Sequence, residues 1–389
     1  MLNAFLAIAL LVVSVSINAE TLLVEKKVFE TADFKTFNGS TINKVRVGWE
    51  SYGKLNAEKD NVILITHYFT GNSHAAGKYS ASDAKAGYWD AIIGPGKAID
   101  TSKYFVISSD TLVNAAAHDK NVITTGPATI NSETGKPYGM EFPVVTIRDF
   151  VNLQKLLLNS LSINKLHAVV GASMGSLQAI DWAAAYPEMV PRMISVIGMA
   201  ETDAWTALSL EQWARPIRLD PNWQNGNYYD KTPPLAGLTN SLMLITQQAM
   251  HPEFINKLNA THSPLEKAPL QDINASFSVV TWLEKAAAAR AKEIDANHVL
   301  YLVRANQLFI AGYEADLKTG LSKIKAKSLF LPATNDLLLM PYTAQKARDT
   351  LMLLGKPVQY AEIAGSLGHL DGVYTVQQQA QLISDFLTN

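Results

Sequence analysis

The chain has 389 residues, of which 48% are hydrophobic, and its formal net charge is −2. A chain of this length can bury a sizeable core, either as one large α/β domain with an insertion or as two domains. Acidic and basic residues are mixed throughout, so no basic tract predicts nucleic-acid binding, and the lack of cysteine excludes disulfide bonds.

The N-terminus is a nearly continuous apolar segment, residues 2–17, followed by Asn18, Ala19 and Glu20. This segment is shorter than a typical membrane-spanning helix and resembles the hydrophobic part of a secretory signal peptide. We therefore expect residues 1–19 to be a signal peptide cleaved after Ala19, which would place the mature protein in the periplasm or outside the cell. Because no Lys or Arg precedes the apolar segment, a retained membrane anchor and a wrongly assigned start are alternatives.

The first half of the chain predicts strands that alternate with helices. Residues 22–29 and 45–52 indicate an opening β-hairpin with a turn at Asn38-Gly39. Alternating strands and helices argue for a mostly parallel sheet with helices on both faces. The next strands are expected at 61–66, 104–108, 168–170 and 193–197, and the helices at 146–161 and 177–186.

The pattern changes at about residue 201, where buried strands give way to helices. We interpret 201–315 as a helical lid inserted into an α/β core of residues 20–200 and 316–389. Such a lid would cover the carboxyl edge of the sheet, where open α/β sheets bind ligands. An independent helical domain is the alternative. The expected lid helices span 205–213, 238–250, 276–291 and 298–311, and the later strands and final helix span 327–332, 358–363 and 374–387.

The segment Gly171-Ala172-Ser173-Met174-Gly175 joins a predicted strand to a predicted helix. In this context G-x-S-x-G is the pattern of a nucleophile elbow, a tight turn that exposes a serine. Glycine is needed on both sides because the backbone is strained and neighbouring turns come too close for side chains. An ordinary strand–turn–helix would also accept these residues, so the rest of the chain must decide.

Ser173, Asp336 and His369 each follow a predicted strand, in the chain order of an α/β hydrolase. His369 would act as the general base for Ser173, and Asp336 would orient the imidazole ring. Asp371 is a rival acid, but it is only two residues from His369 and would reach the ring nitrogen poorly. The three residues together predict a catalytic triad.

Two backbone N–H groups are candidates for an oxyanion hole. The loop after the strand 61–66 would supply the N–H of Phe69, and the start of the helix after the elbow would supply that of Met174. Metal catalysis has little support, because the sequence contains no H-x-x-x-H or H-E-x-x-H spacing, and a nicotinamide fingerprint is missing. We therefore expect neither a metal nor a cofactor.

Many short segments of the chain combine into a specific pattern. They are HYFTG at 67–71, SH at 73–74, GYWD at 87–90, IGPGKAIDT at 93–101, TGP at 125–127, TGKPYG at 134–139, FP at 142–143, TIRD at 146–149, SMG at 173–175, DPNW at 220–223, YY at 228–229 and DAN at 295–297. With them the chain, from about residue 45 onward, resembles the homoserine O-acetyltransferase family of the α/β-hydrolase superfamily. The resemblance implies an acyl-enzyme on Ser173, whose acyl group passes to an alcohol or to water. It also suggests a homodimer formed through the lid.

The chain departs from this family at the elbow and at the end of one lid helix. Ala172 and Ser176 replace two glycines of the family's G-G-S-M-G-G, which is a tolerable change. Where the family has a Tyr-Arg-Ser run, whose arginine resembles a clamp for a carboxylate, this chain has Ala249, Met250 and His251.

Two further departures also remove charge. Leu370 follows the predicted catalytic histidine where the family has aspartate, and Gln307 stands where an aspartate is usual. A zwitterionic substrate such as homoserine would lose its charged contacts. Arg215, Arg218 and Arg304 are the cations that could compensate.

The predicted export and the loss of the family's charged residues together favour hydrolysis over acetyl transfer. Acetyl-CoA is a cytosolic metabolite, so an exported enzyme would lack this donor, whereas water is always available. We predict an enzyme that hydrolyses a small ester and contacts its substrate through Thr70, Tyr229 and Met250. A genuine O-acetyltransferase for homoserine or another alcohol, and a non-catalytic binding protein, are the alternatives. The expected partner is a small-molecule ester or acyl donor, without nucleic acid and without stable membrane association after cleavage.

Overall fold

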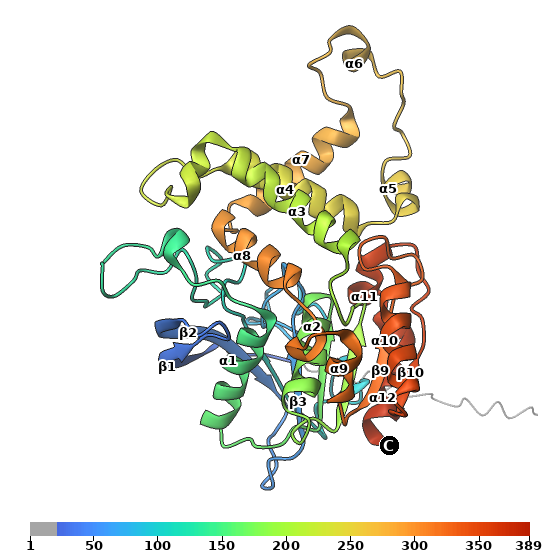
Figure 1. Cartoon of the computed structure of the whole chain (residues 1–389). Helices are drawn as coiled ribbons and strands as arrows, with labels where there is room; N and C mark the ends of the chain where they lie inside the picture. Colours follow the sequence, from blue (N-terminus) through green and yellow to red (C-terminus); the bar gives the residue numbers. More distant parts are fainter. Residues whose placement is uncertain (1–21) are drawn as a thin grey trace, which may run out of the picture.

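The computed structural model describes residues 22–389, so the predicted signal peptide at 1–19 lies outside the described residues. The described chain forms an eight-stranded sheet in the order β1-β2-β6-β3-β7-β8-β9-β10 (Figure 1). β2 pairs antiparallel with both β1 and β6, and all other neighbours pair parallel, which confirms the mostly parallel sheet. The strands are β1 (Lys27–Lys35), β2 (Thr41–Tyr52), β3 (Val62–Thr66), β6 (Phe105–Ser109), β7 (Ala168–Ala172), β8 (Arg192–Val196), β9 (Lys327–Leu331) and β10 (Val358–Tyr360).

Two strand predictions differ from the structure at the edges of the sheet. The first strand begins at Lys27 rather than at residue 22, because residues 22–24 bond to Lys78 instead. The last strand ends at Tyr360, and Ile363 forms only an isolated bridge further on. A small separate sheet was not predicted; it consists of β4 (Ile93–Gly94) and β5 (Ile99–Asp100).

Apolar side chains alternate along the central strands and build one core on each face of the sheet. On β3, Leu64 packs into the core that contains α1 (Ile147–Ser160), α2 (Met174–Ala185) and α10 (Pro341–Leu353). Ile63 and Ile65 face the opposite core, which contains α12 (Ala380–Thr388). This alternation follows from the strand period of two, and it confirms that helices cover both faces.

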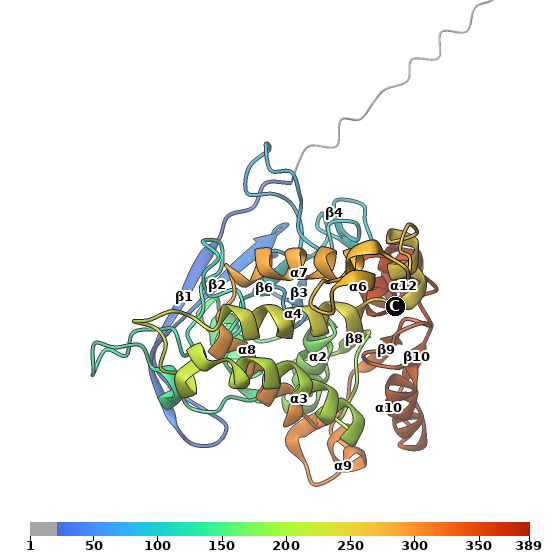
Figure 2. The same ribbon diagram turned by 90° about the horizontal axis from the view of Figure 1, so that it is seen from above.

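Between β8 and β9 the chain is helical, as predicted. The four predicted helices are present as α3 (Ala204–Leu219), α4 (Leu235–Ala249), α7 (Ser278–Ala291) and α8 (Ala296–Gln307), here called the cap helices. Seen from above, α3, α4 and α7 run side by side across the sheet (Figure 2). Three shorter helices were not predicted, and one of them, α6, projects away from the body of the protein (Figure 1). They are α5 (Pro252–Leu258), α6 (Lys267–Gln271) and α9 (Leu317–Ser322).

The C-terminal helices also differ from the prediction. α10 was not expected, and the single closing helix predicted at 374–387 is divided. Residue 374 ends α11 (Asp371–Tyr374), because Thr375, at φ −123°, lies outside the helical range. A 3₁₀-helix follows at Val376–Gln379, and α12 begins only at Ala380. Among residues 22–389, no helix is both long enough and apolar enough to cross a membrane.

Candidate active site

Ser173 occupies the sharp turn between β7 and α2. Its φ of 55° and ψ of −121° lie in a region that residues with a side chain rarely adopt. The flanking glycines are sterically required, since a Cβ on Gly171 would lie 2.1 Å from the Gly175 carbonyl oxygen. A Cβ on Gly175 would lie 2.0 Å from the Thr66 carbonyl oxygen. This turn therefore requires glycine at both flanking positions of G-x-S-x-G, because a larger residue would collide with the backbone.

A continuous hydrogen-bond chain connects the three residues of the predicted triad. The Ser173 Oγ lies 2.8 Å from Nε2 of His369, and Nδ1 of His369 lies 2.7 Å from Oδ2 of Asp336. The three side chains come from the turn after β7, the loop after β9 and the short 3₁₀-helix at 368–370 after β10. They are largely buried, with 8%, 7% and 2% of Ser173, His369 and Asp336 exposed. This geometry lets the imidazole accept the serine proton while the carboxylate stabilises the imidazolium.

The second carboxylate oxygen of Asp336 is held by the backbone. Oδ1 accepts the N–H groups of Leu338 at 2.8 Å and Leu339 at 3.0 Å. Asp371, the rival acid, instead accepts the Leu367 N–H at 3.0 Å and the Thr375 hydroxyl at 2.5 Å. Asp371 therefore supports the loop that carries the histidine, and Asp336 is the acid that contacts it.

Phe69 lies in the loop after β3, and Met174 begins α2 directly after the neighbouring strand β7. The register of β3 and β7 pairs Thr66 with Gly171, which sets the loop after β3 beside the elbow. The Thr66 hydroxyl also donates to the Gly175 carbonyl at 2.7 Å and ties the two segments together. Neither candidate N–H donates a hydrogen bond to a group within residues 22–389, so both are free to bind a developing oxyanion.

His67 begins the loop that carries Phe69, and it is completely buried. Its Nδ1 lies 2.8 Å from the Tyr68 carbonyl oxygen, and its Nε2 lies 3.4 Å from the Asn114 amide nitrogen. Asn114 itself is oriented by bonds to the Gly71 carbonyl and the Ala116 N–H. These partners assign the single proton of neutral His67 to Nδ1, and burial lowers the pKa of the ring to about 4.

We expect His67 to make the stability of the protein pH-dependent. Its pKa is about 4 in the folded protein and 6.5 ordinarily, so the unfolded chain binds the proton more readily. The stabilisation is complete above about pH 6.5 and is lost as the pH falls towards 4, by about 3 kcal/mol for a shift of this size. Denaturant unfolding of the wild type and of His67→Gln at pH 7 and pH 4 measures this loss. It is the difference between the two proteins in how much the free energy of unfolding falls from pH 7 to pH 4. His262→Gln, at an exposed histidine, is the control, and equal pH dependence in all three proteins would contradict the assignment.

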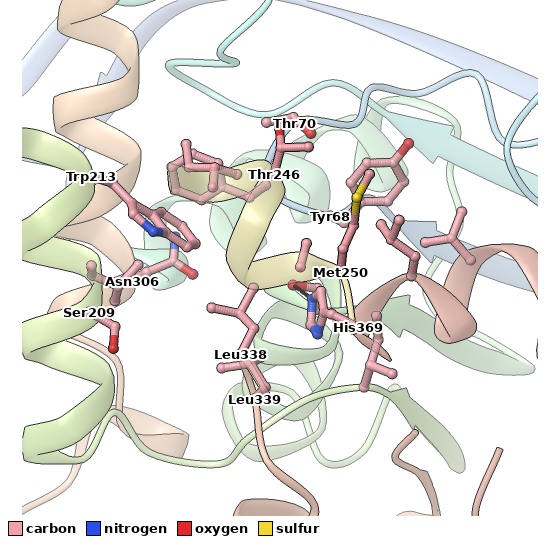
Figure 3. Close-up of a pocket in the computed structure, with 18 of the residues that line it drawn as sticks. Tyr68, Thr70, Ser209, Trp213, Thr246, Met250, Asn306, Leu338, Leu339 and His369 are labelled. Carbon is pink, nitrogen blue, oxygen red and sulfur yellow. Dashed lines mark hydrogen bonds between the residues drawn. The ribbon is translucent and has the colours of Figure 1, made fainter. Parts of the chain in front are cut away.

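A cavity of about 390 Å³ opens above Ser173 and His369, between the sheet edge and the cap helices. In Figure 3, Trp213, Ser209 and Asn306 lie on one side of it, and Tyr68 and His369 lie on the other. The walls are mainly apolar, as in most small-molecule sites. The apolar lining residues include Phe69, Ile197, Met199, Leu210, Trp213, Ile245, Leu338, Leu339, Leu370 and Val373.

Two of the three predicted substrate contacts line this cavity. Thr70 and Met250 are in its wall, but Tyr229 is not, and its expected role was wrong. The Tyr229 hydroxyl donates to Asp295 at 3.2 Å and accepts from the Asn297 amide at 3.2 Å. Through these bonds Tyr229 belongs to a polar cluster that joins the start of α8 to the segment after α3.

The arginine in the cavity wall is not one of the three that the sequence suggested. Arg218 forms an ion pair with Glu211, Arg304 bonds to Gln307, and neither they nor Arg215 line the cavity. Arg290 of α7 does line it. The sequence holds one faint signal for this residue, a lone arginine in the alanine-rich stretch 286–291.

Comparisons with known proteins place the chain in a family of the same fold. Residues 104–357 match the alpha/beta hydrolase fold family. The chain is 37% identical to homoserine O-acetyltransferases of Methanococcoides burtonii and Deferribacter desulfuricans, over 92% and 95% of its own length and 72% and 97% of theirs.

Two solved structures cover nearly the whole chain. The structure of esterase E22 shares 59% identity with a TM-score of 0.93, covering 94% of this chain and 100% of its own. Homoserine O-acetyltransferase from Bacillus anthracis shares 37% identity with a TM-score of 0.91, covering 94% of this chain and 98% of its own.

Proposed function

The chain belongs to the homoserine O-acetyltransferase-like family of the α/β-hydrolase superfamily, and from this premise we propose that it hydrolyses a small ester through an acyl-enzyme on Ser173. The observation that carries the proposal is the hydrogen-bond chain from Asp336 through His369 to Ser173, which opens directly into an apolar cavity.

The reaction has two halves that use the same groups. Nε2 of His369 takes the Ser173 proton while Oγ attacks the ester carbonyl carbon, and the resulting oxyanion accepts the N–H groups of Phe69 and Met174. His369 then gives the proton to the leaving alcohol, and an acyl-enzyme remains. Water attacks this ester in the second half, again with His369 as base, and an acid is released. Each oxyanion-hole donor typically lowers the barrier by roughly 3–4 kcal/mol.

The cavity favours water over homoserine as the acyl acceptor. Homoserine carries an ammonium group, and no aspartate or glutamate among residues 22–389 lines the cavity to bind it. Leu370 contributes an apolar wall beside His369. The 59% identity to esterase E22, compared with 37% to the homoserine O-acetyltransferases, supports the same choice.

A competition between acceptors tests this proposal. The wild type is expected to hydrolyse 4-nitrophenyl acetate and to release acetate even with excess homoserine present, with little O-acetylhomoserine formed. Acetyl-CoA with homoserine should give no comparable turnover. Product analysis by mass spectrometry distinguishes the outcomes. Homoserine acetylation as fast as ester hydrolysis would show a genuine acetyltransferase, and a chain without turnover or fluorophosphonate labelling of Ser173 would be a binding protein.

Export remains part of the proposal. It rests on the apolar segment 2–17 and the small residue at Ala19. Cell fractionation and N-terminal sequencing should find a mature protein that begins at Glu20. An unprocessed cytosolic chain would contradict export and would give the enzyme access to acetyl-CoA.

A further inference from the structure

Within residues 22–389, Arg290 is a cation in the cavity wall without an anionic partner. It lies on α7 and donates from Nη1 to the Thr246 hydroxyl oxygen of α4, at 3.1 Å. The Thr246 hydroxyl proton is already donated to the Leu242 carbonyl at 2.6 Å, so Thr246 acts towards Arg290 as a neutral acceptor. Throughout residues 22–389, no carboxylate forms an ion pair with Arg290 and no other hydrogen bond uses its remaining N–H groups.

The surroundings of Arg290 make an unpaired charge costly. The guanidinium carries five N–H donors and stays charged at neutral pH. It is partly buried beside Tyr68 and Tyr374, and this burial lowers its pKa from the ordinary value. A charged group that loses water without gaining a partner is destabilised, and an anion bound in the cavity would relieve that cost.

Within residues 22–389, the rest of the cavity wall has no carboxylate that would repel a bound anion or attract a bound cation. Among the described residues that line it, Arg290 and His369 are the ionisable groups that can carry positive charge, and none can carry a carboxylate charge. Tyr68, Thr70 and Thr246 also line the cavity and add neutral hydroxyl groups to its wall (Figure 3). The cavity therefore combines an apolar lining with one fixed positive charge.

We propose that Arg290 binds a carboxylate carried by the ester substrate, so that the preferred substrates are anionic esters without an ammonium group. This inference rests on the proposed esterase function, because it names the substrate class of the same cavity. The carboxylate belongs either to the acyl part or to the alcohol part of the ester. In both cases planar guanidinium–carboxylate pairing supplies the recognition.

Matched ester pairs test the inference. For the acyl side, kcat/KM is measured for mono-4-nitrophenyl succinate and for 4-nitrophenyl butyrate. For the alcohol side, acetate release is followed from 4-acetoxybutyrate and from its neutral amide. In at least one pair the wild type should prefer the anionic ester, and Arg290→Met should lower kcat/KM for that ester on the order of 10- to 100-fold, mainly through KM. The neutral partner should change little, and Arg290→Lys should recover part of the loss.

Arg304→Met is the control, because it removes an exposed positive charge outside the cavity. It should leave both esters of each pair unaffected. The inference is overturned if the wild type shows no anionic preference in either pair, or if Arg290→Met lowers anionic and neutral turnover equally. These outcomes are separate from a failure of the proposed function, in which the wild type would not hydrolyse even the neutral esters. If Arg290→Met folds poorly, calorimetry gives the same comparison. It measures succinate binding to Ser173→Ala and to the double variant that also carries Arg290→Lys.

Discussion

Ser173→Ala is expected to reduce ester hydrolysis by about 10⁴- to 10⁶-fold, because the hydroxyl that would form the acyl-enzyme is lost. The hydrogen-bond chain behind it would remain, since Nδ1 of His369 stays paired with Asp336. Substrate binding in the cavity should therefore survive while kcat collapses. Steady-state kinetics with 4-nitrophenyl acetate, and the loss of fluorophosphonate labelling, measure the effect.

Ser176→Ala is the matched control for this variant. Ser176 is a fully buried serine in the first turn of α2, and its hydroxyl bonds to Ser195 at 2.6 Å rather than to His369. It should keep most of the wild-type rate, although its stability can change. If Ser173→Ala retained more than about a hundredth of the wild-type rate, the nucleophile would have to be another residue.

Asp336→Asn is expected to lower kcat by about 10⁴-fold with little change in KM. The two N–H groups of Leu338 and Leu339 already occupy Oδ1, so the asparagine oxygen would take that position. Its NH₂ group would then face Nδ1 of His369 and would require a lone pair there. The ring proton would move to Nε2 and point at Ser173 Oγ, where it blocks proton abstraction.

Two measurements separate this tautomer effect from simple unfolding. Thermal unfolding of Asp336→Asn should stay cooperative, because the backbone hydrogen bonds to the side chain are retained. Asp371→Asn, in the neighbouring loop, should lose far less kcat, since Asp371 bonds to Leu367 and Thr375 and not to the imidazole. A larger kcat loss in Asp371→Asn than in Asp336→Asn would assign the orienting role to the other acid.

Much of the fold was predictable because its signals are local. The buried strands at the centre of the sheet are short apolar runs, and all five residues of β3 are buried. The edges were less predictable: residues 22–24 have an apolar strand pattern, but their hydrogen bonds go to Lys78, far away in the sequence. The start of α1 depends on a local contact as well, because the Asp149 carboxylate accepts the Thr146 N–H at 2.7 Å.

The candidate site also has some features that were predictable from the sequence and others that were not. The turn at Ser173 was predictable because its steric demands are met within five residues, from Gly171 to Gly175. Tyr229 was placed wrongly because its hydroxyl partner, Asp295, belongs to a distant segment. The choice of Arg290 over Arg215, Arg218 or Arg304 depends on which helix faces reach the cavity.

By itself, the sequence determined the type of chemistry: a serine on a strained turn, an acid and a histidine, each after a strand of a parallel sheet. These features depend on backbone sterics and on the order of strands, which are properties of neighbouring residues. Only the tertiary structure decided that Tyr229 lies outside the cavity and that Arg290, rather than Arg215, Arg218 or Arg304, lies in its wall. Both facts depend on contacts between segments tens to hundreds of residues apart, and local patterns in the sequence give only a faint signal for them.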